Sequence, residues 1–282
     1  MITDEPQLRV LGSHMSFLKD AEGQWTIEQV NSSAWQERFT TSASNVPNFG
    51  ITDAVYWFRF DVQNVSALSR DLVLEIRPAT LDHVDVYMSY EGDWKHWQTG
   101  DSLPFSQRPI DYRYFLFPVD IKPEKSLTFY IRAQSSAQMR LFATLSSSDV
   151  FIAKQHQENW TDGVLYGFLI MMVFLNSIFF VFLREKLYLY HIIFNLACLM
   201  FPLAAFGLGF QFLWPNHPQF ANISVPVFSY FALFTIALLT QKMLELPARS
   251  PRLNLILSGL AVVSALGFFL AFLIPVRVST GL

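Results

Sequence analysis

Five side chains at alternate positions of two short apolar runs are suited to binding a small polar molecule. The runs are AVYWFRFDV (54–62) and DHVDVYM (82–88). The five residues are Trp57, Arg59, His83, Asp85 and Tyr87. Successive strand side chains point to opposite faces, so we expect these five to lie opposite the apolar side chains of their strands. An aromatic surface flanked by fixed charges can hold a sugar ring or a carboxylate. The alternative is that they form solvated outer faces of two different sheets.

A long connection with two arginines is the second candidate binding region. The stretch TGDSLPFSQRPIDYRYFLFPV (99–119) joins two aromatic runs through a loop of about twelve residues, whereas hairpin loops usually take two to five. We expect Asp101 and Arg108 to pair and pin the loop, with Phe105 beneath it. In the alternative interpretation, Arg108 and Arg113 point to a ligand anion and the loop forms the rim of a binding site.

Patterns typical of catalysis and metal binding are scarce in this chain. Its six histidines are scattered without an HExxH motif, and its one cysteine, Cys198, permits no disulfide. His83 and Asp85, two positions apart on a strand, could supply two metal ligands, but no cysteine pair accompanies them. We therefore expect no enzymatic activity, no metal and no cofactor. The chain is also not basic enough to indicate a nucleic-acid partner.

The N-terminal half has the pattern of an all-β domain. Seven short alternating runs are separated by turns rich in Gly, Pro, Asn and Ser, which predicts a β-sandwich over residues 1–147. The predicted strands are 54–62, 71–76, 82–88, 94–98, 112–119, 127–134 and 139–145. Residues 148–162 are expected to form a linker helix that continues into the C-terminal half.

The C-terminal half has the composition of a membrane domain. Residues 1–162 carry 14 Lys and Arg against 21 Asp and Glu, whereas residues 163–282 carry 6 against 2. Four apolar runs in this half are each long enough to cross a hydrocarbon core of about 30 Å as a helix. The predicted spans are 163–183, 187–212, 223–241 and 253–276.

The basic residues between the spans predict the orientation of the chain. They follow the first and third spans and are absent from the loop 213–222. They are Arg184, Lys186, Lys242, Arg249 and Arg252. Because positive loops face the cytoplasm, the N-terminal domain is expected outside. Gly163 and Gly167 form a GxxxG pattern on the first span, which would suit a homodimer.

Several segments of both halves resemble one receptor family. The segments WFRF (57–60), LDHVDVYM (81–88) and TGDSLPFSQRPI (99–110) resemble the type 2 extracellular domain of the bacterial 7TMR-DISM receptors. The segments DGVLYGFLIMMVFLNSIFF (162–180) and GLGFQFLWPN (207–216) are similar to the membrane domain of that family.

The resemblance implies a jelly-roll-like periplasmic sensor domain on a bacterial inner-membrane protein. It further implies a carbohydrate or related small-molecule ligand, contact with membrane lipid, and a signal relayed to a cytoplasmic output such as a diguanylate cyclase or kinase. The family has seven spans, so we expect the four found here to be a truncated membrane domain without its output. No secretory signal is visible, which suggests a removed signal or an upstream start. The alternative function is a membrane-tethered carbohydrate-binding or adhesion module that does not signal.

Overall fold

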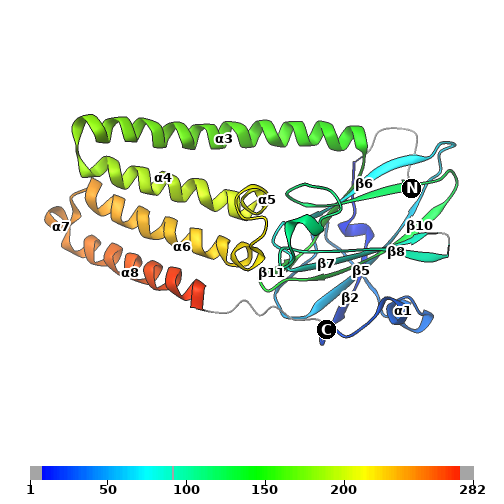
Figure 1. Ribbon diagram of the computed structural model, residues 1–282. Helices are drawn as coiled ribbons and strands as arrows, with labels where there is room; N and C mark the ends of the chain where they lie inside the picture. Colours follow the sequence, from blue (N-terminus) through cyan, green and yellow to red (C-terminus); the bar gives the residue numbers. More distant parts are fainter. Residues whose placement is uncertain (1–7, 91, 274–282) are drawn as a thin grey trace. The chain divides into compact units, whose positions relative to one another are not determined.

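The structure is a computed structural model that describes residues 8–90 and 92–273 (Figure 1). The chain divides into two compact units. The first contains Met1–Gln155 together with Phe210–Pro218, and the second contains His156–Gly209 and Gln219–Leu282.

The first unit is a β-sandwich, as the alternating runs predicted, and its strand pairs are antiparallel. One sheet has the order β1 (Leu8–Val10), β12 (Phe142–Ser147), β6 (Arg70–Arg77) and β9 (Phe115–Ile121). The other has the order β3 (Thr40–Thr41), β2 (Ser16–Asp20), β5 (Val55–Gln63), β10 (Ser126–Gln134), β7 (His83–Tyr90) and β8 (Asp93–Thr99). A two-stranded sheet pairs β11 (Gln138–Arg140) with β4 (Asn48–Ile51).

The inner faces of the two large sheets form the main hydrophobic core. The predicted inward residues of β5 and β7 all lie in it, namely Tyr56, Phe58, Phe60, Val62, Val84, Val86 and Met88. Phe60 stacks on Phe129 of β10 with ring centroids 4.9 Å apart. The period-two alternation of β5 and β7 therefore assigned the inward face correctly.

The structure corrects two of the predicted strands. The run 139–145 is divided at Leu141, because β11 pairs with β4 whereas β12 pairs with β6 in a different sheet. The run 112–119 starts as a strand only at Phe115. The carbonyls of Tyr112 and Arg113 accept hydrogen bonds from Arg108 instead of joining a strand ladder.

Several short elements complete the first unit and were not predicted. The strands β1 to β4 are two to five residues long, too short for an alternation signal. Four helical turns accompany them, namely η1 (Gly12–His14), α1 (Ile27–Val30), α2 (Ser33–Gln36) and η2 (Phe105–Gln107). The turns α1 and α2 lie in the segment between β2 and β3.

Among the described residues, four helices are long and apolar enough to cross a membrane. They are α3 (Ser148–Leu183), α4 (Lys186–Ala205), α6 (Pro218–Met243) and α8 (Pro251–Leu273). The shorter helices are α5 (Leu208–Phe212) and α7 (Leu246–Arg249). The predicted linker helix and the first predicted span form one continuous helix, α3.

The second predicted span, 187–212, is interrupted. The helix α4 ends at Ala205, and Gly207 has a φ of 81°, a left-handed conformation that favours glycine at the end of a helix. The residues 274–276 of the fourth predicted span lie outside the described residues. Within the second unit, α6 and α8 pack closely, since a Cβ atom added at Gly267 would meet the Tyr230 ring at 2.6 Å.

Candidate ligand-binding site

The five residues predicted from β5 and β7 lie in one sheet. Strand β10 separates β5 from β7, and its Tyr130 pairs with Arg59 on one side and Tyr87 on the other. Tyr87 in turn pairs with His96 of β8, so that one row of side chains crosses four strands. The alternative interpretation, in which the predicted residues belong to two different sheets, is therefore wrong.

A second row on the same face carries a buried charge. Trp57 pairs with Arg132, and Arg132 pairs with Asp85. Arg132 Nη1 lies 3.3 Å from Asp85 Oδ2, and His96 Nε2 lies 3.0 Å from Asp85 Oδ1. Asp85 is 4% exposed, so its carboxylate depends on these partners rather than on water. Asp85 thus contacts side chains from both neighbouring strands, Arg132 of β10 and His96 of β8.

Trp57 faces outward from the main core, as predicted, but it is not accessible. It has no exposed surface and packs with Ile27 and Val30 of α1 in a second hydrophobic cluster. Tyr130 lies in the same cluster, and its hydroxyl donates to Asn31 Oδ1 at 3.1 Å. The expectation that Trp57 offers an open platform for a sugar ring is therefore wrong, because the segment between β2 and β3 covers it.

Part of this face remains accessible, and we call it the outer patch. It consists of Arg59, Asp61, Tyr87, Trp94 and His96. Tyr87 and His96 stack with centroids 4.3 Å apart and planes within 2°. Arg59 Nη2 lies 3.4 Å from Asp61 Oδ2. The outer patch thus presents a stacked ring pair, a guanidinium and a carboxylate, which are groups of the kind that bind a polar ring-shaped ligand.

Burial shifts the pKa of two residues on this face. It raises the pKa of Tyr87 to about 12, with a further contribution from the charge of Asp85. The Tyr87 hydroxyl is therefore a hydrogen-bond donor throughout the physiological range. Burial also lowers the pKa of His83, which favours the neutral ring. Among the described residues, no partner lies within hydrogen-bond distance of His83 Nε2, and no group of three or more potential ligands could hold a metal ion.

The long loop is pinned from within by Arg108. Arg108 is 6% exposed, and its Nη1 donates to the carbonyls of Tyr112 at 2.9 Å and Arg113 at 2.7 Å. Its guanidinium lies 4.5 Å from the ring centroids of both Phe105 and Phe115. The structure thus places Phe105 beneath the loop, as the structural interpretation predicted.

Two further buried titratable residues, Asp101 and Arg113, accompany Arg108 in this loop. Burial lowers the pKa of Arg108 to about 10, partly offset by Asp101. Burial and the charge of Asp82 raise the pKa of Asp101 well above its usual range. Arg113 is 3% exposed and lies over the rings of Tyr112 and Tyr114. Neither arginine faces solvent, so direct ligand binding by Arg108 or Arg113 would require the loop to open.

The long loop also holds the segment Phe210–Pro218, which belongs to the same unit. The Phe105 amide donates to the Pro215 carbonyl at 3.1 Å, and the rings of Phe105 and Phe210 meet edge to face at 5.5 Å. Gln211 Nε2 donates to Asp111 Oδ1 at 3.2 Å. The loop therefore anchors a segment that lies in the chain between α4 and α6.

The start of α3 is anchored to the outer face of the four-stranded sheet. Glu75 of β6 is 1% exposed, and its carboxylate lies 2.6 Å from Lys154 Nζ and 2.6 Å from Arg77 Nη2. Phe151 of α3 packs edge to face on Tyr112 at 5.8 Å. A buried ion cluster and an aromatic contact thus fix the first turns of α3 on the sandwich.

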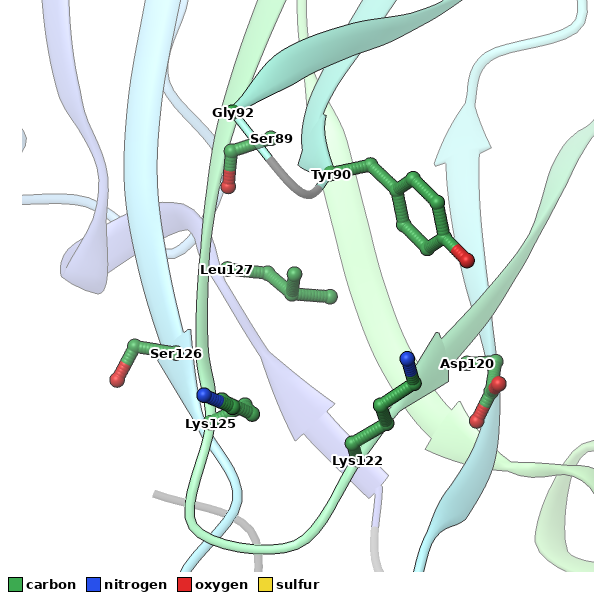
Figure 2. Close-up of a pocket in the computed structure, with 8 residues that line it drawn as sticks. All are labelled: Ser89, Tyr90, Gly92, Asp120, Lys122, Lys125, Ser126 and Leu127. Atoms are coloured by element: carbon green, nitrogen blue, oxygen red, sulfur yellow. The ribbon is translucent and has the colours of Figure 1, made fainter.

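One cavity in the sandwich was not predicted from the sequence. It has a volume of about 450 Å³ and lies between the β7–β8 turn and the β9–β10 turn (Figure 2). Its lining residues are Ser89, Tyr90, Gly92, Asp120, Lys122, Lys125, Ser126 and Leu127. The sequence feature that could have pointed to this cavity is KPEK at 122–125, in which two lysines flank a turn between strands.

Comparison with known protein families identifies both halves of the chain. Residues 12–147 match the family described as 7TMR-DISM extracellular 2, and residues 158–282 match 7TM diverse intracellular signalling. A search of curated proteins found no match. The two family matches follow one another in the order that the resemblance implied. With its outward-facing β-sandwich and its membrane-spanning helices, the chain is a receptor-type sensor module that belongs to the 7TMR-DISM family.

Proposed function

We propose that this chain is the input module of a receptor in the bacterial inner membrane. The sandwich lies in the periplasm and binds a small molecule of the carbohydrate class at the outer patch. The helices relay the binding event to a cytoplasmic output module. Gly163 and Gly167 leave space for a neighbour, since no described atom lies within 4 Å of a Cβ atom built at either position, and a second copy of the chain would suit this space.

One observation supports the proposed relay: the sandwich unit includes two segments that are continuous with membrane helices. One is the start of α3, held by Glu75 through Lys154. The other is Phe210–Pro218, held by the long loop through the Phe105 amide. Well-packed anchors transmit displacements because protein interiors are close-packed. A change in strand packing would therefore reach the membrane domain at two points of the chain.

The outer patch supports binding of a hydroxylated ring. The stacked Tyr87 and His96 rings supply apolar surface, and Arg59 and Asp61 supply a donor and an acceptor on the same face of the sheet. Arg59 is held over the Tyr130 ring, with the guanidinium carbon 6.0 Å from the centroid, so its position is partly fixed before a ligand arrives. Such preorganisation reduces the entropy lost on binding.

The binding step can be tested on the full chain in lipid nanodiscs with a panel of mono- and oligosaccharides, read by thermal shift and then by titration. A charge-assisted hydrogen bond contributes about 1.5–3 kcal/mol, so Arg59→Ala should weaken binding of a responding sugar roughly ten- to a hundredfold. Arg140→Ala, on the separate two-stranded sheet, is the matched control and should bind normally. A panel without any responding sugar, or equal binding by Arg59→Ala, would refute this site.

A fluorescent label on the cytoplasmic side can distinguish a receptor that relays a signal from a membrane-tethered module that only binds. In a Cys198→Ser background, a fluorophore at Ala248→Cys, in the exposed turn after α6, should change its emission when the sugar binds. The response should vanish in Arg59→Ala. A sugar that binds without any change at this label would favour a membrane-tethered binding module over a receptor.

The orientation has its own test. Alkaline phosphatase is active only when exported, so a fusion after Asn216 should be active and a fusion after Ser250 inactive. An inactive fusion after Asn216 and an active fusion after Ser250 would place the basic loops outside. This result would contradict the proposal that the signal passes from the periplasm to the cytoplasm.

A further inference from the structure

We propose that a cavity at the ends of α4 and α6 binds the headgroup of a membrane phospholipid that carries a phosphate and a primary ammonium group. The cavity has a volume of about 340 Å³ and lies between these two helices and the turn α7 (Figure 1). The lining residues that carry the argument are Tyr190, Leu238, Gln241, Lys242 and Glu245. The proposal rests on the membrane-spanning helices and not on sugar binding by the sandwich.

The position of the cavity favours a lipid over a soluble ligand. Tyr190 lies near the start of α4 and Lys242 near the end of α6, and both helices are long and apolar enough to cross a membrane. The ends of such helices lie at the level of the lipid headgroups, where tyrosine is enriched and lysine reaches toward water. Leu189 and Met243, which adjoin these two residues in the sequence, are exposed. A ligand with a polar head and apolar chains therefore matches both the cavity and its surroundings.

Lys242 is the group that would bind the phosphate. It is exposed, and none of the carboxylates in the described part of the chain forms an ion pair with it. An ammonium group is a compact charge that pairs with phosphate oxygens. The half-buried Tyr190 adds a hydroxyl to the same lining, and a phosphate oxygen can accept its proton. The cavity thus offers a cation and a neutral donor to the single negative charge of a phosphodiester.

Two acceptors in the lining favour a headgroup that also carries donors. Both hydrogen bonds from Arg249 to Glu245 go to the same oxygen, Oε2, at 3.1 and 2.9 Å, which leaves Oε1 as an acceptor. Gln241 Nε2 donates to the Asn254 carbonyl at 3.2 Å and to Ser258 Oγ at 2.8 Å, so the amide is held in place and its own oxygen remains an acceptor. A primary ammonium group has three N–H donors for these oxygens.

The charges of the lining complement the charges of this headgroup. Lys242 and Glu245 have opposite charges, as the phosphate and the ammonium group do. Glu245 has a φ of 50°, a left-handed conformation that is uncommon for residues other than glycine. Residues in such conformations cluster at binding and active sites. A headgroup with a phosphate alone would use Lys242 and leave the acceptors of the cavity without a donor.

Phospholipids that differ only in their headgroups test this selectivity. The full chain in detergent is titrated with phosphatidylethanolamine, phosphatidylcholine and phosphatidylglycerol of identical acyl chains, and bound lipid is counted by native mass spectrometry. Phosphatidylcholine replaces the ammonium protons with methyl groups, so it should bind at least tenfold more weakly than phosphatidylethanolamine. Phosphatidylglycerol, which has no ammonium group, should also bind more weakly. Equal or tighter binding of either lipid would overturn the proposal.

The headgroup without acyl chains separates a lipid from a soluble ligand. Glycerophosphoethanolamine has the same phosphate and ammonium groups, but it cannot cover the exposed apolar residues beside the cavity. It should therefore bind at least tenfold more weakly than phosphatidylethanolamine. Binding as tight as that of the lipid would assign the cavity to a soluble ligand and contradict the proposal.

Variants locate the binding and separate the two charges. Lys242→Met and Glu245→Gln should each weaken phosphatidylethanolamine about tenfold or more, and only Lys242→Met should also weaken phosphatidylcholine. Arg252→Met and Glu185→Gln, at exposed residues outside the lining, are the matched controls and should bind normally. Arg59→Ala should bind lipid normally even though it affects the sugar site. If the controls weaken lipid binding as much as the cavity variants, or if neither cavity variant weakens it, the proposal is wrong while the proposed function stands.

Discussion

The two outer faces of the sandwich carry similar residue types but are covered in different ways. On the six-stranded sheet, the turn α1 buries Trp57 and leaves Arg59, with 28% of its side chain exposed, at the edge of an open patch. On the four-stranded sheet, the first turns of α3 contribute to a closed cluster in which Glu75 is 1% exposed. Alternation along a strand thus assigns a residue to a face, whereas the element that packs on the face determines its exposure.

The buried carboxylates of the two faces also differ in the distances to their partners. Glu75 lies 2.6 Å from both Arg77 Nη2 and Lys154 Nζ, and it also accepts a hydrogen bond from Thr144 at 3.2 Å. Asp85 has longer contacts, 3.3 Å to Arg132 and 3.0 Å to His96. The contacts of Glu75 are therefore the closer of the two, and we interpret the Glu75 cluster as a fixed joint.

The largest expected effect concerns Trp57. Removing a fully buried aromatic side chain costs about 3–5 kcal/mol, so Trp57→Ala should lower the free energy of unfolding about as much as Phe58→Ala in the main core. The alternation alone predicts a much smaller loss for Trp57 than for Phe58. Thermal unfolding of both variants, followed by circular dichroism in the β-sheet region, makes the comparison. A near-native Trp57→Ala would mean that α1 does not cover this face.

The next effect concerns the joint at Glu75. Glu75→Gln keeps the size of the side chain but leaves Arg77 and Lys154 without their shared carboxylate, which should cost about 3 kcal/mol in unfolding free energy. Asp61→Asn is the control, because the Asp61 side chain is 56% exposed, and it should lower the unfolding free energy only slightly. Adding Lys154→Met to Glu75→Gln should cost less than the sum of the single losses, and additive losses would argue against direct coupling.

A smaller effect is expected at Arg59. Its ion pair with Asp61 is partly exposed, and such pairs contribute about 0–1 kcal/mol to stability. Arg59→Ala should therefore unfold at nearly the wild-type denaturant concentration. Unfolding of the domain in this variant would show that Arg59 supports the fold, and the outer patch would then resemble the Glu75 cluster.

The smallest effect is a pH dependence from His83. Burial lowers the pKa of His83 in the folded state, so the unfolded chain binds a proton more readily than the folded chain. This contribution to stability is present above the unfolded pKa of about 6.5 and declines as the pH falls below it. His83→Gln should flatten the loss of thermal stability between pH 7 and pH 5. An unchanged slope would assign the acid sensitivity to other groups.

The sequence predicted those parts of the fold that depend on local periodicity. The inward residues of β5 and β7 follow from the alternation of their strands, and the presence of four long apolar helices follows from the four uncharged runs. The burial of Trp57 could not be predicted, because α1 is a four-residue turn without a helical pattern of its own. The cavity also escaped prediction, since Tyr90 and Lys122 come together only through the stacking of two sheets. The outward direction of a side chain was predictable, but the segment that covers it was not.

The edge strands of the two sheets affect how the sandwich behaves at high concentration. Strand β9 carries Pro118, which has no amide proton to offer an incoming strand, and Pro118 and Asp120 are exposed. Strand β8 exposes Asp93, Lys95 and His96 along its edge. Charges and proline on edge strands oppose strand addition by other chains. These two edges should therefore resist aggregation. This resistance would be an advantage in a crowded compartment that contains many unfolded chains able to add to an exposed strand.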